Sequence, residues 1–576
     1  MLDPSRVWKA GRDFGRDELL RAVKGRRFLT QTGILDELNL AGIAALLRGR
    51  GRMTPSMTVR FHAANSPHRT ALIDAQTGRS FSFAEFDITV DRSVRMLERL
   101  GVRPGDPVLV MLENSAEFMF LQLAIGRLGG SAVSVSWRST APELAYLFEN
   151  SQARAVFFTA GRADVVREAL AASRHAVSGR VVRVGVHASE FPSYEELLSG
   201  VSDRVVVDEA ASEDASFVIY TSGTTGKPKG AVRKFDRHST LQILGFLAET
   251  PFRIGQRHLA VCPLYHATAF AFVGISLLLG NTVVLLDFEP ASFLAALERY
   301  RIHHTAVVPT QLFRTLELGV EAVRATDTSS LVAMFTGGAP LSGVLASRIM
   351  EAYGDKLFNF YGATETGFVT LAKPHDLRVA PGTIGRVIPG NDVRLLDDAG
   401  RPVAEGEAGE LYVKSGNLVT GYYANRGATN EAMREGYFSV GDLARKDARG
   451  YLFIEGRKRD MIISGGVNVY PREVEAVMAE FPSVGDVAVV GLPDPEWGER
   501  VHAFVEPRVG ETIDERALLE FCRTRLSGPK RPRGVTVLDV LPRNPTGKIL
   551  KRELRELADG SHRGSVADSA SEGRSP

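Results

Sequence analysis

Short apolar runs rich in β-branched residues alternate with helical stretches from about residue 69 to residue 360. The runs span residues 107–111, 132–136, 155–159, 216–221, 282–286 and 305–309. Such runs are typical of strands in a parallel sheet with helices on both faces. Between them, residues 82–100 have a helical pattern, with a capping box of Ser82 and Glu85 at its start and Gly101 after its end. The pattern predicts an α/β fold with doubly wound sheets.

The pattern changes twice toward the C-terminus. Short strands with turn signals over about residues 392–423 predict a small β subdomain. The charged stretch EGRKRDMIIS then precedes a fresh α+β unit with a helix opened by Pro471, strand-like runs at 486–492, 501–506 and 535–540, and a helix at 515–526. We expect a large N-terminal domain over residues 1–456, a small mobile α+β domain over 457–558 and a disordered tail over 559–576.

Composition excludes several classes of protein. The 576 residues are 44% hydrophobic and 24% charged, with a formal net charge of +2, so no overall charge favours nucleic acid. Cys262 and Cys522 are too few for a disulfide framework or a four-ligand zinc site. No signal peptide or apolar run of about 20 residues is present, which predicts a cytoplasmic protein. Apolar stretches with clustered arginines at residues 23–57 leave peripheral membrane contact open, and a homodimer also stays open.

The segment YTSGTTGKPKG, residues 220–230, has the composition of a phosphate-binding loop after a strand. Its candidate ligands are Thr221, Ser222, Gly223, Thr224, Thr225, Gly226, Lys227 and Lys229. Glycines let backbone N–H groups approach an anion, hydroxyls donate further hydrogen bonds, and a lysine supplies charge. Only two residues separate the first two glycines, so this is not the usual loop of nucleotide hydrolases. By composition alone, a flexible turn remains the alternative.

A second segment, NFYGATETG at residues 359–367, ends a strand-like run in a turn. It contains Tyr361, Gly362, Ala363, Thr364 and Glu365. Magnesium is commonly bound by one carboxylate plus substrate phosphate oxygens, so Glu365 is a candidate ligand. The alternative is a glutamate that stabilises the first turn of a helix.

Two further segments contain charged residues in turns. Asp442 follows Gly441, and with Arg457 it is a candidate for binding ribose hydroxyls, although an Asp after Gly is also a turn former. Near the C-terminus the turn at 545–547 presents Lys548, which could stabilise negative charge that develops between a carboxylate and a phosphate.

With these segments in this order, the chain resembles the adenylate-forming superfamily of acyl-CoA synthetases, peptide-synthetase adenylation domains and luciferases. The resemblance covers about residues 61–557 and rests on YTSGTTGKPKG, FYGATETG, VGD, GRKRDMIISGGVNVYPREVE and PRNPTGK. It implies that ATP and a carboxylate give acyl-AMP and pyrophosphate, and that a thiol, here CoA, then displaces AMP.

The resemblance also implies roles for individual residues. Residues 221–229 would hold the phosphates, Thr224 and Glu365 would hold Mg²⁺, Tyr361 would lie near adenine, and Asp442 and Arg457 would bind ribose. Lys548 would serve the first step. The small domain would then rotate at Arg459, a position where the family usually has Asp or Lys, and bring Ser464, Gly465 and Gly466 to the pantetheine channel. The residue before Gly441 is Val440 where the family usually has Thr.

The acyl site implied by the resemblance contains Tyr265, His266, Phe270, Gly337, Gly338 and Ala339, with His266 as a gate toward the thiol tunnel. The apolar stretch at 268–279 suggests an apolar acid, and the overall similarity is to bacterial fatty acyl-CoA synthetases. We therefore expect a medium- to long-chain fatty acid–CoA ligase that uses ATP, Mg²⁺ and CoA.

Other functions share these motifs. An aryl-acid–CoA ligase, an acyl-AMP ligase that loads a carrier protein, and a luciferase remain open. A non-catalytic nucleotide-binding relative should lack Lys548 or Glu365, and both are present. A dehydrogenase is disfavoured because no GxGxxG opens a strand-to-helix unit.

Overall fold

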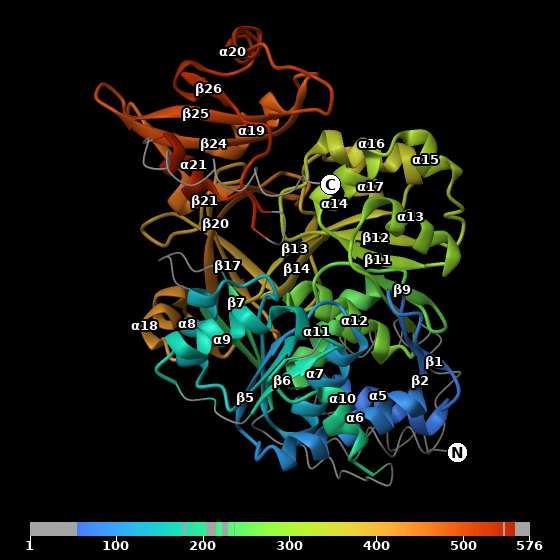
Figure 1. Ribbon diagram of the computed structural model, residues 1–576. Helices are drawn as coiled ribbons and strands as arrows, with labels where there is room; N and C mark the ends of the chain where they lie inside the picture. Colours follow the sequence, from blue (N-terminus) through green and yellow to red (C-terminus); the bar gives the residue numbers. More distant parts are fainter. Residues whose placement is uncertain are drawn as a thin grey trace, which may run out of the picture.

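The computed structural model describes residues 54–175, 177, 180–187, 189–202, 215–221, 228–234, 237–544 and 548–558. Within these residues, four sheets and their helices form a large α/β part and a smaller C-terminal unit (Figure 1). The predicted tail at 559–576, and all of the arginine-rich segment at 23–57 except its last four residues, lie outside the described residues. No helix in the described ranges is both long and apolar enough to cross a bilayer.

The first sheet has nine strands among the described residues. In spatial order they are β15 (Arg386–Val387), β14 (Gly367–Ala372), β13 (Leu357–Ala363), β12 (Ala333–Thr336), β11 (His304–Val307), β9 (Arg257–Ala260), β10 (Thr282–Leu285), β1 (Thr70–Asp74) and β2 (Ser80–Ser82). The strands from β13 to β1 are parallel, and β14, β15 and β2 add antiparallel edges. The sheet is therefore of the predicted α/β kind.

The second sheet has seven strands in the described ranges. Their order is β18 (Gly421–Tyr422), β8 (Lys229–Lys234), β7 (Ser216–Thr221), β4 (Ser131–Ser134), β3 (Pro107–Met111), β5 (Ala155–Thr159) and β6 (Val181–Val184). The strands from β7 to β6 are parallel, whereas β8 and β18 are antiparallel to their neighbours.

Helices accompany these two sheets. They are α5 (Pro55–Asn65), α6 (Phe83–Arg99), α7 (Ala116–Leu128), α8 (Ala141–Ser151), α9 (Ala163–Ala172), α10 (Tyr194–Ser199), α11 (Arg237–Ala248), α12 (Ala267–Leu278), α13 (Pro290–Arg299), α14 (Pro309–Leu316), α15 (Val320–Ala325), α16 (Gly343–Tyr353) and α17 (Pro374–Val379). One continuous apolar core joins α6, α7 and α12 to strands of both sheets, with Leu72, Val108 and Val273 among its fully buried members. The two sheets are thus held on shared helices, which fixes their strand ends relative to one another.

The start of α6 confirms the predicted capping box. Ser82 Oγ accepts a hydrogen bond from the backbone N–H of Glu85 at 3.2 Å, and the N–H of Ser82 donates to Glu85 Oε2 at 2.8 Å. Two N–H groups that the helix leaves unpaired are satisfied in this way.

A third, antiparallel sheet corresponds to the predicted β subdomain, but its limits differ from the prediction. It contains β16 (Asp392–Leu396), β17 (Gly409–Lys414), β19 (Met433–Arg434), β20 (Tyr437–Lys446) and β21 (Leu452–Arg457), with α18 (Arg426–Ala432) before β19. Gly421 and Tyr422, which the pattern assigned to this subdomain, instead pair with β8 of the second sheet. Strand pairing over such a sequence distance is not encoded in local turn signals.

After β21 the chain forms the C-terminal unit. Its strands are β22 (Ile462–Ser464), β23 (Val467–Val469), β24 (Val484–Asp494), β25 (Gly498–Pro507) and β26 (Gly534–Val537), and its helices are α19 (Pro471–Met478), α20 (Glu515–Arg523) and α21 (Lys551–Ala558). Pro471 is the first residue of α19, as predicted. The predicted last strand ends earlier, because residues 538–540 lie outside β26. Figure 1 shows this unit at one end of the molecule, beyond β20 and β21.

Candidate active site

A cavity of about 2840 Å³ lies between the carboxyl ends of the parallel strands and the C-terminal unit. Gly337 and Ala339 follow β12, Glu365 follows β13, and His266 comes after β9; all of them line the cavity. Lys548 from the C-terminal unit lines the same cavity. Carboxyl ends of parallel strands are the usual ligand-binding edge of such sheets.

Glu365 is held in the turn between β13 and β14 and is only 6% exposed. The hydroxyl of Tyr422 donates a hydrogen bond to Glu365 Oε1 at 2.9 Å. Arg233, the next-to-last residue of β8, donates a hydrogen bond to the carbonyl of Thr364 at 2.6 Å. Burial lowers the pKa of Arg233 to about 10, and the charge of Glu365 opposes that shift. A buried, anchored carboxylate facing the cavity fits a Mg²⁺ ligand that shares the ion with phosphate oxygens.

The predicted ribose-binding residues are adjacent in the third sheet. Asp442 in β20 is the register partner of Arg457 in β21, and Arg457 Nε is 3.3 Å from Asp442 Oδ1. Tyr361 donates its hydroxyl hydrogen to Asp442 Oδ2 at 2.7 Å. Burial raises the pKa of Tyr361 well above its ordinary value, and Asp442 adds to the effect, so Tyr361 is a stable phenolic donor. The structure therefore joins the FYGATETG and VGD motifs by a direct contact.

Lys548 lines the cavity and is held by two hydrogen bonds to Asn544. The backbone N–H of Asn544 donates to the carbonyl of Lys548 at 2.8 Å, and the N–H of Lys548 donates to Asn544 Oδ1 at 2.9 Å. Burial, and after it the positive charge of Arg457, lower the pKa of Lys548 to about 8. The lysine is thus near the candidate ribose site and its charge is sensitive to pH just above neutrality.

The phosphate-loop prediction is only partly within the described residues. Thr221, the last residue of β7, is the register partner of Lys229, the first residue of β8, so the loop links two antiparallel strands. Lys229 Nζ lies over the ring of Tyr422, 5.2 Å from its centroid. The other loop candidates, Ser222, Gly223, Thr224, Thr225, Gly226 and Lys227, lie outside the described residues, and among them is Thr224, the predicted metal ligand.

The predicted acyl-site residues line one side of the cavity. His266 is the N-cap residue of α12, its Nε2 is buried with no hydrogen-bond partner among the described residues, and burial lowers its pKa to about 4. Tyr265 packs beside His266, with ring centroids 4.3 Å apart, and Phe270 packs on Phe217 at 4.9 Å. At neutral pH His266 is therefore an uncharged ring with an unpaired nitrogen at the cavity.

Small residues shape another part of the cavity wall. A Cβ on Gly337 would lie 2.6 Å from Phe360, so only glycine allows this approach. Gly338 has φ +76° and Ala339 follows it into the cavity lining. Gly362 similarly leaves no room for a side chain, because a Cβ would be 2.1 Å from the carbonyl oxygen of Gly367. The wall is thus formed by backbone and can contact a flat or linear group closely.

Helix α12, which contains most of the apolar stretch 268–279 noted in the sequence, has a stripe of cavity-lining residues on one face. Ala267, Ala271, Gly274 and Leu278 all line the cavity and are all partly exposed, whereas Phe272, Val273 and Leu277 are buried. Their spacing of four, three and four residues places them on one helical face. A Cβ on Gly274 would meet nothing within 4 Å. Eleven residues of α-helix span about 16 Å, so this apolar side of the cavity, called the channel below, follows the helix over about that length from His266.

The predicted pantetheine segment is not at the cavity. Ser464, Gly465 and Gly466 form the turn between β22 and β23, and none of the three lines the cavity. The N–H of Gly465 donates to the carbonyl of Trp497 at 2.8 Å in the same unit. Arg459, the predicted hinge residue, lies in the short helical turn between β21 and β22. In this arrangement the C-terminal unit presents Lys548 and keeps residues 464–466 away.

Tyr422 and Arg233 are functional candidates that sequence reasoning missed. Both lie on strands outside the quoted motifs, and each contacts the FYGATETG turn from a distant part of the chain. The sequence contained one signal for Arg233: it is a charged residue at a position where a buried side chain is expected, in the strand after the predicted phosphate loop.

Comparison with known proteins agrees with this geometry. The family model for AMP-binding enzymes matches residues 59–423, and the model for the AMP-binding enzyme C-terminal domain matches residues 473–548. A feruloyl-CoA synthase from an Amycolatopsis species is 37% identical over 497 residues, which is 86% of this chain and 96% of that protein. A long-chain-fatty-acid–CoA ligase from Mycobacterium tuberculosis is 33% identical over 86% of this chain and 97% of its own length. The solved structure of ATP-bound MatB from Rhodopseudomonas palustris has a TM-score of 0.80 at 29% identity, covering 89% of this chain and all of that chain.

Proposed function

Because this chain belongs to the AMP-binding enzyme family, we propose that it converts an elongated, apolar carboxylic acid, of the medium- to long-chain fatty acid class, to its CoA thioester. It is an AMP-forming acid–CoA ligase. ATP and the acid give acyl-AMP and pyrophosphate, and the thiol of CoA then displaces AMP. A carboxylate is a poor electrophile, so the adenylate supplies the leaving group that the thiol requires.

The first step uses the residues that the cavity brings together. The ammonium of Lys548 stabilises the negative charge that develops as the carboxylate oxygen attacks the α-phosphorus of ATP. Asp442 accepts hydrogen bonds from the ribose, held in position by Tyr361. Glu365 would hold Mg²⁺ through a carboxylate oxygen, and the ion would supply positive charge to offset that of the phosphates.

The second step needs a different arrangement of the C-terminal unit. We propose that residues 457–558 rotate at Arg459 after the adenylate forms, which withdraws Lys548 and brings Ser464–Gly466 over the cavity. The exposed apolar side chains beside that turn, Ile463 at 52% and Val467 at 39%, would gain a partner surface on rotation. In this step His266, uncharged at neutral pH, would lie beside the thiol as it attacks the acyl carbonyl.

The channel along α12 is the observation that supports an elongated acid. It begins at His266, the N-cap residue next to the candidate reaction centre, and continues past Ala271 and Gly274 to Leu278. A channel of about 16 Å is much longer than a single aromatic ring, and its lining is apolar. Burying each methylene of a chain there contributes about 0.8 kcal/mol.

A hydroxycinnamic-type aryl acid is the second candidate. It is favoured by the feruloyl-CoA synthase, which is 37% identical, against 33% for the long-chain-fatty-acid–CoA ligase. The backbone wall at Gly337 and Gly338 could contact a planar ring closely.

A steric block separates the two candidates. Gly274→Leu would fill the channel in the middle of α12 without touching the part beside His266. Gly126→Leu in α7 is the matched control, because a Cβ there also meets nothing within 4 Å and the residue does not line the cavity. Pyrophosphate release is measured with straight-chain acids from butyrate to palmitate and with ferulate, each with and without CoA, followed by mass analysis of the thioester.

For the proposed substrate, the wild type favours the longer chains and Gly274→Leu lowers their kcat/KM at least about tenfold, while butyrate is unaffected. Preference for ferulate, with no effect of Gly274→Leu, would support the aryl acid and contradict the fatty acid. Pyrophosphate release without a CoA thioester would point to a carrier protein as acceptor.

A further inference from the structure

Helix α5 contributes two residues to the cavity from outside every motif. Pro55 and Thr58 both line the cavity, and Thr58 is only 4% exposed although its side chain is polar. Its hydroxyl donates to the carbonyl of Pro55 at 2.7 Å within the helix, so the outward surface of Thr58 is its methyl group. A satisfied hydroxyl next to a methyl group presents an apolar surface to a ligand.

The same face of α5 is bound to the far end of α12. His62 Nε2 is 3.2 Å from the carbonyl oxygen of Leu278, the last residue of α12. Pro55, Thr58 and His62 are spaced three and four residues apart, which places them on one face of α5. His62 thus joins α5 to the end of α12 that is farthest from His266, and Thr58 lies about one helical turn, or about 6 Å, from this contact on the same face of α5.

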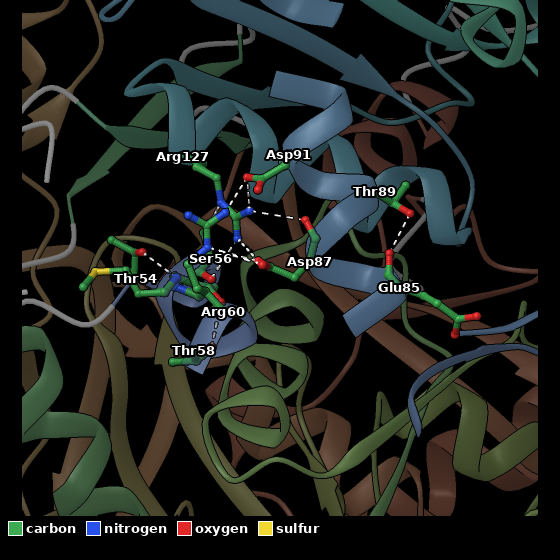
Figure 2. A network of polar contacts seen from close by, with 11 residues as sticks. Thr54, Ser56, Thr58, Arg60, Glu85, Asp87, Thr89, Asp91 and Arg127 are labelled. Carbon is green, nitrogen blue, oxygen red and sulfur yellow. Dashed lines mark hydrogen bonds and ion pairs between the residues drawn. The ribbon is translucent and has the colours of Figure 1, made fainter. Parts of the chain in front are cut away.

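A buried charge cluster holds the other side of α5 (Figure 2). The Arg127 side chain is fully buried and donates to Asp91 at 2.6 Å, to Asp87 at 2.7 Å and to Ser56 Oγ at 2.8 Å. Arg60 of α5 pairs with the same two aspartates of α6. Two arginines and two aspartates balance in charge, and a buried cluster of this kind fixes the register of the elements that it joins.

The two faces of α5 point in different directions. Ser56 and Arg60 are four residues apart on the face toward Asp87 and Asp91, and Thr58, midway between them, is turned about 200° away. Figure 2 shows Thr58 on the side of α5 opposite Asp91. The face of α5 with Ser56 and Arg60 is therefore held by the charge cluster, and the face with Thr58 lines the cavity.

We propose that Thr58 and Pro55 form the end wall of the acyl channel and set the longest chain that the enzyme accepts, with the Arg127–Asp91 cluster positioning this wall. The inference rests on the proposed function, because it assigns the distal end of the same acyl site. A chain that runs along Ala271 and Gly274 would end its course against the Thr58 methyl group.

The test changes the size of the wall residue. Thr58→Leu extends the wall into the channel, and Thr58→Ala shortens it. Thr89→Leu in α6 is the matched control, because Thr89 also donates its hydroxyl to a helical carbonyl, that of Glu85 at 2.7 Å, and does not line the cavity. The kcat/KM for pyrophosphate release is measured for each variant over straight-chain acids and over 4-alkoxycinnamates of increasing alkyl length.

We expect Thr58→Leu to lower kcat/KM by about tenfold for the longest acid that the wild type accepts and to leave the shortest acid within about twofold. Thr58→Ala should extend the accepted length, and Thr89→Leu should leave the profile unchanged. If the dependence of kcat/KM on acid length is the same in both Thr58 variants as in the wild type, the end-wall proposal is overturned and the proposed function is not. A wild type that activates none of these acids would overturn the proposed substrate class, and the wall with it.

The positioning role of the cluster has a separate readout. Asp91→Asn removes one charge that Arg127 and Arg60 share. We expect this variant to accept acids longer than the wild-type limit while its rate with the shortest acid is retained. A lower melting temperature with an unchanged length profile would show that the cluster supports folding but does not position the wall.

Discussion

The hydroxyl of Tyr422 donates a 2.9 Å hydrogen bond to Oε1 of Glu365, and through it a strand of the second sheet supports the candidate magnesium ligand on the first. The same tyrosine ring lies under Lys229 Nζ at 5.2 Å. One side chain therefore contacts both the carboxylate and a lysine of the predicted phosphate loop.

Replacing Tyr422 by Phe should weaken the first half-reaction through magnesium. A hydrogen bond to a charged group contributes about 1.5–3 kcal/mol, so we expect kcat/KM for adenylate formation to fall about tenfold or more. Raising the Mg²⁺ concentration should recover part of the loss. Tyr423→Phe is the control, since the Tyr423 hydroxyl donates to the carbonyl of Ser151 at 3.3 Å and does not touch Glu365. Equal losses in the two variants would contradict this role.

Lys548→Ala should separate the two half-reactions. Removing the ammonium should lower acyl-AMP formation by about 100- to 1,000-fold, whereas thioester formation from supplied acyl-AMP should be spared. Lys414→Ala, at an exposed lysine of β17 that does not line the cavity, should affect neither. Rapid-quench assays of each half-reaction measure this difference, and a comparable loss in both would refute the division of labour.

The pH dependence of adenylate formation should reflect the same lysine. Its pKa is lowered to about 8, so the side chain is charged below pH 8 and increasingly neutral above it. If the charged form is the active one, kcat/KM for the first step falls as pH rises through about 8. Lys548→Arg should keep some activity and move this fall to higher pH, because arginine stays charged. A profile that does not move in the Arg variant would assign the fall to another group.

A buried histidine pair should make the fold sensitive to acid. The Nδ1 atoms of His258 and His304 are 3.1 Å apart in the core of the first sheet. Burial lowers the pKa of His258 to about 3 and that of His304 well below its usual value, so the folded protein keeps both neutral. In the unfolded chain both histidines bind a proton below about pH 6.5. The free energy of unfolding should therefore fall by about 3 kcal/mol between pH 6.5 and pH 5.

Urea unfolding at the two pH values measures that loss. The double variant His258→Leu/His304→Leu should remove most of the pH dependence, and His68→Leu, at an exposed site, should leave it in place. If the free energy of unfolding changes equally with pH in the wild type and in the double variant, the histidine pair does not cause the acid sensitivity.

Local features of the fold were predictable from the sequence because they depend on neighbouring residues. The capping box of Ser82 and Glu85, the start of α19 at Pro471 and the parallel β3 and β5 all follow from short-range pattern and backbone chemistry. The FYGATETG and VGD residues were also identified as candidates from their turn chemistry and their order. They could be assigned to a common site only through the resemblance to the adenylate-forming superfamily. That resemblance is supported by the order of the motifs along the chain.

Features that depend on long-range packing were not predictable. Gly421 and Tyr422 join the second sheet through β8, about 190 residues earlier in the chain. The channel along α12 is visible only once the buried and cavity-facing sides of an almost wholly apolar helix are distinguished. Thr58 lies in a helix with no recognisable motif, and its place at the cavity depends on contacts with α12 and α6.

A competition experiment tests the central claim most directly. The enzyme is incubated with ATP, Mg²⁺, CoA and an equimolar mixture of butyrate, laurate, palmitate, benzoate and ferulate, and the CoA thioesters formed at early times are identified by mass. The proposed function predicts that lauroyl-CoA or palmitoyl-CoA dominates. Feruloyl-CoA as the main product, or no CoA thioester at all, would contradict it.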